Sequence, residues 1–337
     1  MKKIIICLCL AVMICLLAFP VSAATEGNFK YTITDGKATV TQYAGSGDVQ
    51  NPAPLDGCPV TAIGNWAFEF CSGVTSVTMP DSVTTIGDFA FNSCTGLTSV
   101  TISKNVTSIG KYAFAGCPKL TAFAIPEGVT TLGEYAFSDC TGLKEISIPG
   151  TITAIGNGTF YGCTSLPSVT IGDGVKTIGQ YVFSDCTALT SVTLPNSITA
   201  IGSGAFDCCS ALPSIVLPEG LFAIESHTFS GCTSLKEITI PKSVLHIFDN
   251  AFADVPLETV YYGGSKAQWK EIKLNNNEIL RTVKIRYAET SNLLADIPWN
   301  SFPVYLVLVA ILAGGIFLYR TYQKKKRHRR KKPKFLH

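Results

Sequence analysis

Residues 97–117 read LTSVTISKNVTSIGKYAFAGC, and this stretch holds most of one unit of a repeat. Residues 99–102 alternate small polar and apolar side chains, which is typical of a strand with one buried face. Residues 106–109 form a second short extended piece, and Gly110 allows a tight turn. Residues 111–114 are then expected to make a short helical or irregular turn that carries Phe114 into the interior.

The repeat is 23 residues long and recurs without an insertion. Nine phenylalanines mark it: Phe68, Phe91, Phe114, Phe137, Phe160, Phe183, Phe206, Phe229 and Phe252. A cysteine follows each of the first eight by three residues: Cys71, Cys94, Cys117, Cys140, Cys163, Cys186, Cys209 and Cys232. One unit cannot bury its own apolar residues, but stacked units can. The sequence therefore predicts a β-rich solenoid of α/β type, with a parallel sheet on one face.

The consensus Leu-x-x-Val-x-Ile-Pro-x-x-Val-Thr-x-Ile-Gly-x-x-Ala-Phe-x-x-Cys resembles the BspA-type leucine-rich repeat over residues 63–255. Residues 24–62 and 256–288 look like the N-terminal and C-terminal caps of that family. The resemblance implies a surface protein that acts in adhesion, in binding host extracellular proteins or in contact between cells. The last units drift from the consensus, because Glu225 and Phe248 replace the turn glycine and Val255 replaces the cysteine, as terminal repeats do.

The two ends of the chain carry membrane and export signals. Residues 1–23 have a basic start, an apolar run and small residues before a cleavage point, so they are expected to be a signal peptide, with an uncleaved anchor as the alternative. Residues 289–302 are a linker without the Leu-Pro-x-Thr-Gly motif of wall-anchored bacterial proteins. Residues 303–319 are apolar and predict a single transmembrane helix, and the basic residues 320–337 predict a cytoplasmic tail that contacts the membrane.

Charge is distributed unevenly along the chain. Twelve of the 27 Lys and Arg residues lie in segments 1–23 and 320–337, which contain no acid. Residues 24–319 therefore hold 15 basic residues against all 24 acids, a net charge of −9. An acidic solenoid argues against nucleic acid as a partner.

Ten cysteines remain outside the signal peptide: the eight at the repeated position, Cys58 and Cys208. A secreted protein often joins its cysteines in disulfides, and stacked coils would bring these within bridging distance. Pairing them two by two would break the regular coil, so we expect thiols that pack in the core. Cys208 is expected to be a surface substitution.

The sequence contains no constellation of residues typical of catalysis. It has no phosphate-binding loop, zinc motif or nucleophile elbow, and His227 and His246 have no repeated acid near them. We expect a protein that is not an enzyme and that needs no cofactor or metal.

The outward positions of the predicted sheet form a strip of small polar residues. The candidates for partner binding on it are Ser99, Thr101, Glu145, Ser147, Ser168, Thr170, Ser191 and Thr193. The same strip continues through Ser76, Thr78, Ala122, Ala124, Ser214, Val216, Glu237 and Thr239. We call all of these the strand-face strip. It is either a solvated strand face or a contact surface for a protein or glycan.

A second column of candidates precedes the core phenylalanine by two residues. It consists of Trp66, Phe89, Tyr112, Tyr135 and Tyr181, and Gly158 and Gly204 interrupt it. We call these five residues the aromatic column. Half-exposed aromatic residues serve as binding anchors or as lids over a turn.

Three kinds of function fit this layout. The first is a membrane-tethered protein that binds a protein or glycan partner on another cell or in the matrix. The second is a structural spacer of the cell envelope without a specific ligand. The third is a signalling receptor, which the 18-residue tail disfavours because it has no room for a signalling domain.

Overall fold

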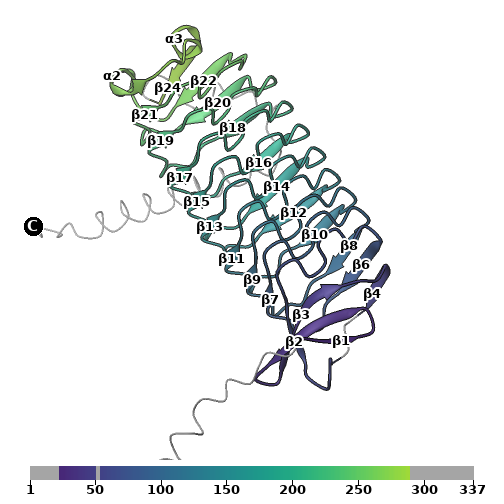
Figure 1. Ribbon diagram of the computed structural model, residues 1–337. Helices are drawn as coiled ribbons and strands as arrows, with labels where there is room; N and C mark the ends of the chain where they lie inside the picture. Colours follow the sequence, from purple (N-terminus) through teal and green to yellow (C-terminus); the bar gives the residue numbers. More distant parts are fainter. Residues whose placement is uncertain (1–22, 51–53, 289–337) are drawn as a thin grey trace, which may run out of the picture. The chain divides into compact units, whose positions relative to one another are not determined.

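The computed structural model describes residues 23–50 and 54–288, which belong to one compact unit spanning Met1–Glu289. In this unit the chain winds into a stack of coils (Figure 1). Equivalent strands of successive coils pair in parallel, 23 residues apart, as Ser168 does with Ser191. The predicted solenoid of 23-residue coils with a parallel sheet is therefore confirmed.

The first face of the solenoid carries the longer strands of each coil. They are β4 (Gly47–Gln50), β6 (Val74–Thr78), β8 (Ser99–Thr101), β10 (Ala122–Ala124), β12 (Glu145–Ile148), β14 (Ser168–Ile171), β16 (Ser191–Thr193), β18 (Ser214–Val216), β20 (Glu237–Ile240), β22 (Thr259–Tyr262) and β24 (Lys284–Tyr287). Their apolar residues alternate inward, so Val169 and Ile171 of β14 are buried while Ser168 and Thr170 are exposed. β4 pairs in parallel with β6, so the N-terminal cap joins the same face.

A second face carries a parallel sheet of shorter strands, where the sequence predicted a second extended piece (Figure 1). It contains β5 (Val60–Ile63), β7 (Thr85–Ile86), β9 (Ser108–Ile109), β11 (Thr131–Leu132), β13 (Ala154–Ile155), β15 (Thr177–Ile178), β17 (Ala200–Ile201), β19 (Ala223–Ile224), β21 (His246–Ile247) and β23 (Lys273–Leu274). One isoleucine or leucine of each of these strands is buried, except in β23, where Leu274 is partly buried. The solenoid thus has two sheet faces, although only one was predicted.

The third side of each coil is an irregular turn rather than a helix, so the helical component of the predicted α/β coil is absent from the repeats. Backbone N–H groups of each coil donate to carbonyl groups of the next one. Trp66 donates to Asp88 at 3.0 Å, and Phe68 donates to Ala90 at 2.7 Å. This pattern repeats in every coil up to Phe229, whose N–H donates to Ala251. The turns are therefore bonded along the stack much as the strands are.

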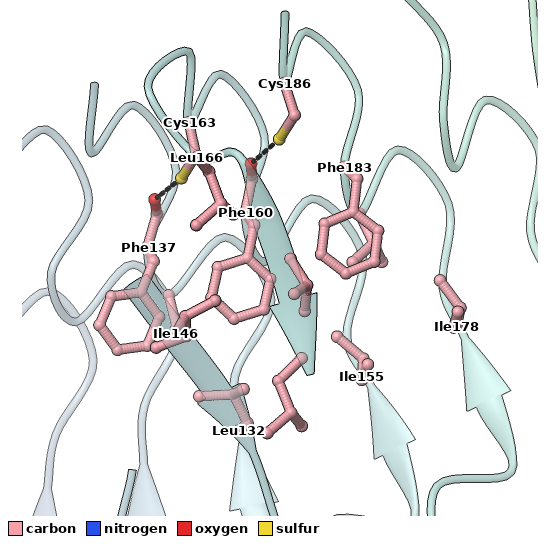
Figure 2. Close-up of a cluster of buried hydrophobic side chains, with 14 of the residues drawn as sticks. Leu132, Phe137, Ile146, Ile155, Phe160, Cys163, Leu166, Ile178, Phe183 and Cys186 are labelled. Atoms are coloured by element: carbon pink, nitrogen blue, oxygen red, sulfur yellow. Dashed lines mark hydrogen bonds between the residues drawn. The ribbon is translucent and has the colours of Figure 1, made fainter. Parts of the chain in front are cut away.

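The core contains one file of stacked phenylalanines and one file of cysteines (Figure 2). Phe137 lies between Phe114 and Phe160, with ring centroids 5.4 and 5.6 Å apart. Seven of the eight repeated thiols donate to the carbonyl oxygen of the core phenylalanine of the previous coil, as Cys163 does to Phe137 at 3.3 Å, and Cys71 donates to the carbonyl of Tyr43 in the cap. A thiol fits this position because it is small and donates a weak hydrogen bond.

The cysteines are unpaired thiols in the structure. Seven of the eight repeated ones are buried, Cys71 is partly buried, and Cys58 and Cys208 are partly exposed. Burial raises the pKa of Cys140, Cys186 and Cys232 to about 12. Burial also raises the pKa of the four remaining buried thiols, Cys94, Cys117, Cys163 and Cys209. Such thiols stay protonated, and hence unreactive, at neutral pH.

The N-terminal end of the stack is closed by three strands: β1 (Ala23–Glu26), β2 (Phe29–Thr34) and β3 (Lys37–Tyr43). β1, β2 and β3 pair in antiparallel fashion, and β3 then pairs in parallel with β5 of the first coil. The ring of Tyr43 stacks on Phe68 with centroids 4.8 Å apart, which extends the phenylalanine file by one ring. The cap thus covers the first coil with the same kinds of contact that join the coils.

The C-terminal end is closed by α2 (Lys266–Glu271), α3 (Ile279–Thr282) and the strands between and after them. The last core phenylalanine has no further coil to receive its N–H. The side chain of Asn277 replaces that coil, because its Oδ1 accepts the N–H of Phe252 at 3.2 Å and its amide donates to the carbonyl of Phe248 at 2.7 Å. Asn277 is buried, and its Oδ1 gives the N–H of Phe252 the partner that the carbonyl of a further coil would supply.

Several sequence predictions fall outside the described residues. They are the signal peptide apart from its last residue, the linker 289–302, the transmembrane helix 303–319 and the basic tail 320–337. Within residues 23–50 and 54–288, no helix is both long and apolar enough to cross a membrane.

Candidate functional site

The strand-face strip lies on the outer surface of the first sheet. Ser99, Thr101, Glu145, Ser147, Ser168, Thr170, Ser191 and Thr193 are all exposed, as predicted. Parallel pairing aligns them in two rows, in which Ser168 faces Ser191 and Thr170 faces both Ser147 and Thr193. Neighbouring strands lie about 4.8 Å apart, so the hydroxyl groups form a regular array.

The hydroxyl groups in the middle of this strip are open to a partner, whereas that of Ser76 donates to Asp48 Oδ1 at 2.7 Å. Those of Ser147, Ser168 and Thr170 make no hydrogen bond to any other described residue, and neither does the carboxylate of Glu145. Ala122 and Ala124 interrupt the array one coil before Glu145 and Ser147. The strip can therefore offer hydrogen bonds over several successive coils, but it provides no enclosed pocket.

The aromatic column lies on the turn side of the coils. Its first four rings stack nearly parallel: Trp66 on Phe89 at 6.1 Å, Phe89 on Tyr112 at 4.8 Å, and Tyr112 on Tyr135 at 5.0 Å. All of these residues have positive φ angles of 53–58°. The structure therefore brings Tyr112 and Tyr135 together but leaves Tyr181 apart from them, as an exposed single ring.

The packing of neighbouring rings explains why two glycines interrupt the aromatic column. Gly158 and Gly204 have the same left-handed backbone as the aromatic residues, with φ of 58° and 63°. The ring of Tyr135 lies over Gly158, and that of Tyr181 lies over Gly204, so that a Cβ atom at either glycine would collide with the ring. Each glycine thus accommodates the tyrosine of the coil before it.

Sequence reasoning missed two exposed aromatic residues, Phe222 beside the second sheet face and Phe70 on the turn side. Phe70 lies two residues after the core phenylalanine of the first coil, has a φ of 58°, and leaves 69% of its surface exposed. The equivalent positions of later coils have the same backbone and hold Gly116, Gly162 and Gly231 among others. These glycines were the available signal that the position is left-handed.

The turn side of the solenoid also carries the net negative charge of the repeats. We define the turn face as the eight residues from the turn glycine position to the cysteine position of each coil: 64–71, 87–94, 110–117, 133–140, 156–163, 179–186, 202–209, 225–232 and 248–255. It contains nine acids and one base, Lys111. The rest of residues 64–255 contains six acids and six bases. The acidity of the repeats therefore lies entirely on the turn face.

The single base of the turn face, Lys111, is paired with one acid and does not neutralise the others. Its Nζ lies 2.8 Å from Oε2 of Glu134. Its hydrogen bond lowers the pKa of Glu134, and the carboxylate in turn raises the pKa of Lys111. Farther along this face, burial raises the pKa of Asp207. Among the described residues, no group of three or more His, Cys, Asp or Glu side chains is placed to hold a metal ion.

Comparisons with known proteins identify the repeat. The family model described as the BspA type leucine rich repeat region matches residues 61–174 and 153–281, in six copies. The leucine-rich repeat protein TpLRR of T. pallidum is 31% identical, with a TM-score of 0.54 over 57% of this chain and 91% of that one. A leucine-rich repeat protein of Bacteroides ovatus is 27% identical, with a TM-score of 0.55 over 79% of each chain. No curated protein sequence matches the chain.

Proposed function

Because the chain belongs to the BspA-type leucine-rich repeat family, we propose that it is a cell-surface protein that binds proteins or glycans of another cell or of the matrix. The observation that carries the proposal is the strand-face strip, whose exposed hydroxyl groups are aligned over successive coils. A flat surface of this kind suits an extended partner better than a small ligand. On this proposal the protein works by binding and catalyses no reaction.

The alternative is a structural spacer of the cell envelope. A spacer would need the stacked core but no particular surface, so changes on the strip would leave its role intact. A matched pair of variants separates the two functions, because Thr170 lies on the strip and Thr131 is exposed on the second sheet face.

We expect Thr170→Arg to abolish binding to at least one ligand on an array of glycans and purified matrix proteins, because the larger cationic side chain would stand above the flat strip. Fragment 24–290 would be applied to the array as wild type, as Thr170→Arg and as Thr131→Arg. Thr131→Arg should bind like the wild type. Equal binding by all three variants, or no binding by the wild type, would favour the spacer.

We also propose that residues 303–319 anchor the solenoid in the cell membrane as a single span, with the basic tail in the cytoplasm. Protease added to intact cells should then remove residues 24–300 and leave a small membrane-bound fragment. Permeabilised cells serve as the control, because there an antibody against residues 324–337 should gain access to the tail. Staining of intact cells by that antibody would contradict this orientation.

A further inference from the structure

Two large aromatic side chains stand exposed on the first coil, at the N-terminal end of the turn face. Trp66 is 55% exposed and Phe70 is 69% exposed, which is more than any other aromatic residue described on this face. Trp66 begins the stack of rings, and Phe89 is the only ring stacked on it among the described residues. Because more than half of its surface remains exposed, the indole ring is accessible to a partner.

Packing does not bury either side chain, although Trp66 stacks on Phe89. The same left-handed backbone accepts glycine in other coils, at the position of Trp66 in Gly158 and Gly204 and at the position of Phe70 in Gly116. It also accepts small polar residues, such as Ser93 at the position of Phe70. The fold therefore does not require large rings at these two positions, and what sets the first coil apart is that it exposes both of them.

The charged residues near Trp66 and Phe70 indicate what kind of partner these rings contact. Glu69 lies between the two rings in sequence, and Asp88 lies in the next coil, where its carbonyl accepts the N–H of Trp66. No basic residue lies on the turn face of these first two coils, and the whole turn face has nine acids to one base. An aromatic face attracts a cation, and the attraction increases beside carboxylates.

We infer that this end of the turn face, formed by Trp66, Phe70, Glu69 and Asp88, binds an extended arginine-rich or lysine-rich segment of a partner protein. The inference rests on the proposed function, that the solenoid is a binding protein, but it uses a different face from the strand-face strip. A guanidinium group would lie on the exposed surface of the indole. Glu69 and Asp88 would supply the counter-charge, although one oxygen of each already accepts a hydrogen bond, from Asn92 Nδ2 at 3.1 Å and from the N–H of Lys111 at 2.7 Å. A neutral glycan would gain nothing from these acids.

The test measures binding of fluorescein-labelled octapeptides to the full chain in dodecyl maltoside micelles by fluorescence anisotropy. One peptide alternates arginine with glycine, and the other alternates glutamine with glycine, because a glutamate peptide would bind the basic tail of the full chain. The wild type should bind the arginine peptide and not the glutamine peptide, and added salt should weaken the binding. The basic tail is present in every variant and therefore affects all of them alike.

The variants use substitutions that the fold already accepts. Trp66→Gly and Phe70→Gly should each weaken binding several-fold, and together by about tenfold or more, as the loss of central aromatic anchors does. Glu69→Gln and Asp88→Asn should weaken it and reduce its dependence on salt, while leaving both rings in place. The matched controls Tyr181→Gly, in the same column, and Glu127→Gln, exposed outside both the strip and the turn face, should change binding less than about twofold.

Three results would overturn the inference: no binding of the arginine peptide, equal binding of both peptides, or equal loss in Tyr181→Gly and Trp66→Gly. None of them would affect the proposed function if Thr170→Arg still abolished binding on the array, because that experiment reports on the other face. Conversely, if Thr170→Arg did not change binding on the array but the arginine peptide still bound, the site on the turn face would be supported and the strand-face strip would not.

Discussion

Fragment 24–290 is expected to unfold steeply as the pH rises from about 10 to about 11, because its core contains seven buried thiols. The ordinary pKa of these thiols is 9.0, and in the folded protein Cys140, Cys186 and Cys232 have values of about 12. Above pH 9 the unfolded chain therefore loses protons that the folded chain keeps. Stability is complete below pH 9 and falls as the pH rises toward 12.

The expected size of the effect is large compared with the stability of a typical domain. Each thiol removes at most about 1.4 kcal/mol per pH unit, so that seven together remove up to about 10 kcal/mol per pH unit. A domain is typically stable by about 5–15 kcal/mol. Urea unfolding followed by circular dichroism from pH 7 to pH 11, with a reductant present, measures the loss.

The control is a variant with fewer buried thiols. Val255 stands at the cysteine position of the last coil, so Cys140→Val with Cys163→Val uses a residue that the fold accepts. Lysine and tyrosine residues titrate alike in both proteins, and the difference in slope therefore reports the thiols alone. The double variant should lose stability with a shallower slope. Equal slopes of stability against pH in the two proteins would contradict the role of the buried thiols. Disulfide-linked peptides that join successive coils would contradict it too.

Replacing Phe137 with alanine should lower the free energy of unfolding by about 3–5 kcal/mol. The ring is completely buried between two stacked rings, and Phe123 meets it edge-on with centroids 4.8 Å apart. Coils on both sides hold the surrounding backbone in place, so the cavity cannot collapse readily. Because a solenoid is stabilised through contacts between neighbours, the loss should weaken both adjoining interfaces. Urea unfolding of fragment 24–290 gives the value.

Phe252→Ala is the matched comparison at the end of the stack. Among the described residues Phe252 stacks on one ring, Phe229 at 5.5 Å, and it lines a surface cavity of about 460 Å³ beside the C-terminal cap. Water can occupy part of the vacated space there, so the loss should be smaller than for Phe137→Ala. Thr170→Ala, on the strip, should stay within about 0.5 kcal/mol of the wild type. Equal losses for the two phenylalanine variants would argue against stacked coils as the source of stability.

The period of the repeat made the core predictable. Side chains at a fixed 23-residue spacing must lie above one another in a stack, so the files of Phe137 and Cys140 follow from the sequence alone. The exposure of Ser168 and Thr170 follows from strand alternation in the same way. The fold and the exposure of the strand-face strip could therefore be predicted from the sequence, because both depend on periodicity.

The turn face was not predictable to the same degree, because its structure depends on backbone conformation. Gly158 looked like an interruption of the aromatic column, although it has the same left-handed backbone as Tyr135. Phe70 has no counterpart ring in later coils, so no column indicated it. Asn277 lies outside the repeat, and its role in closing the stack arises from a hydrogen bond to Phe252 that no spacing predicts.

The bonding along the turn side has a consequence for how such a protein changes in length. Each coil offers the next one the same donors and acceptors, and Asn277 meets the last coil with the groups that a further coil would supply. Loss or duplication of one 23-residue unit would therefore leave both caps with the surfaces they now contact. The length of the stack, and with it the extent of the strand-face strip, can then evolve in steps of about 4.8 Å, with no redesign of either end.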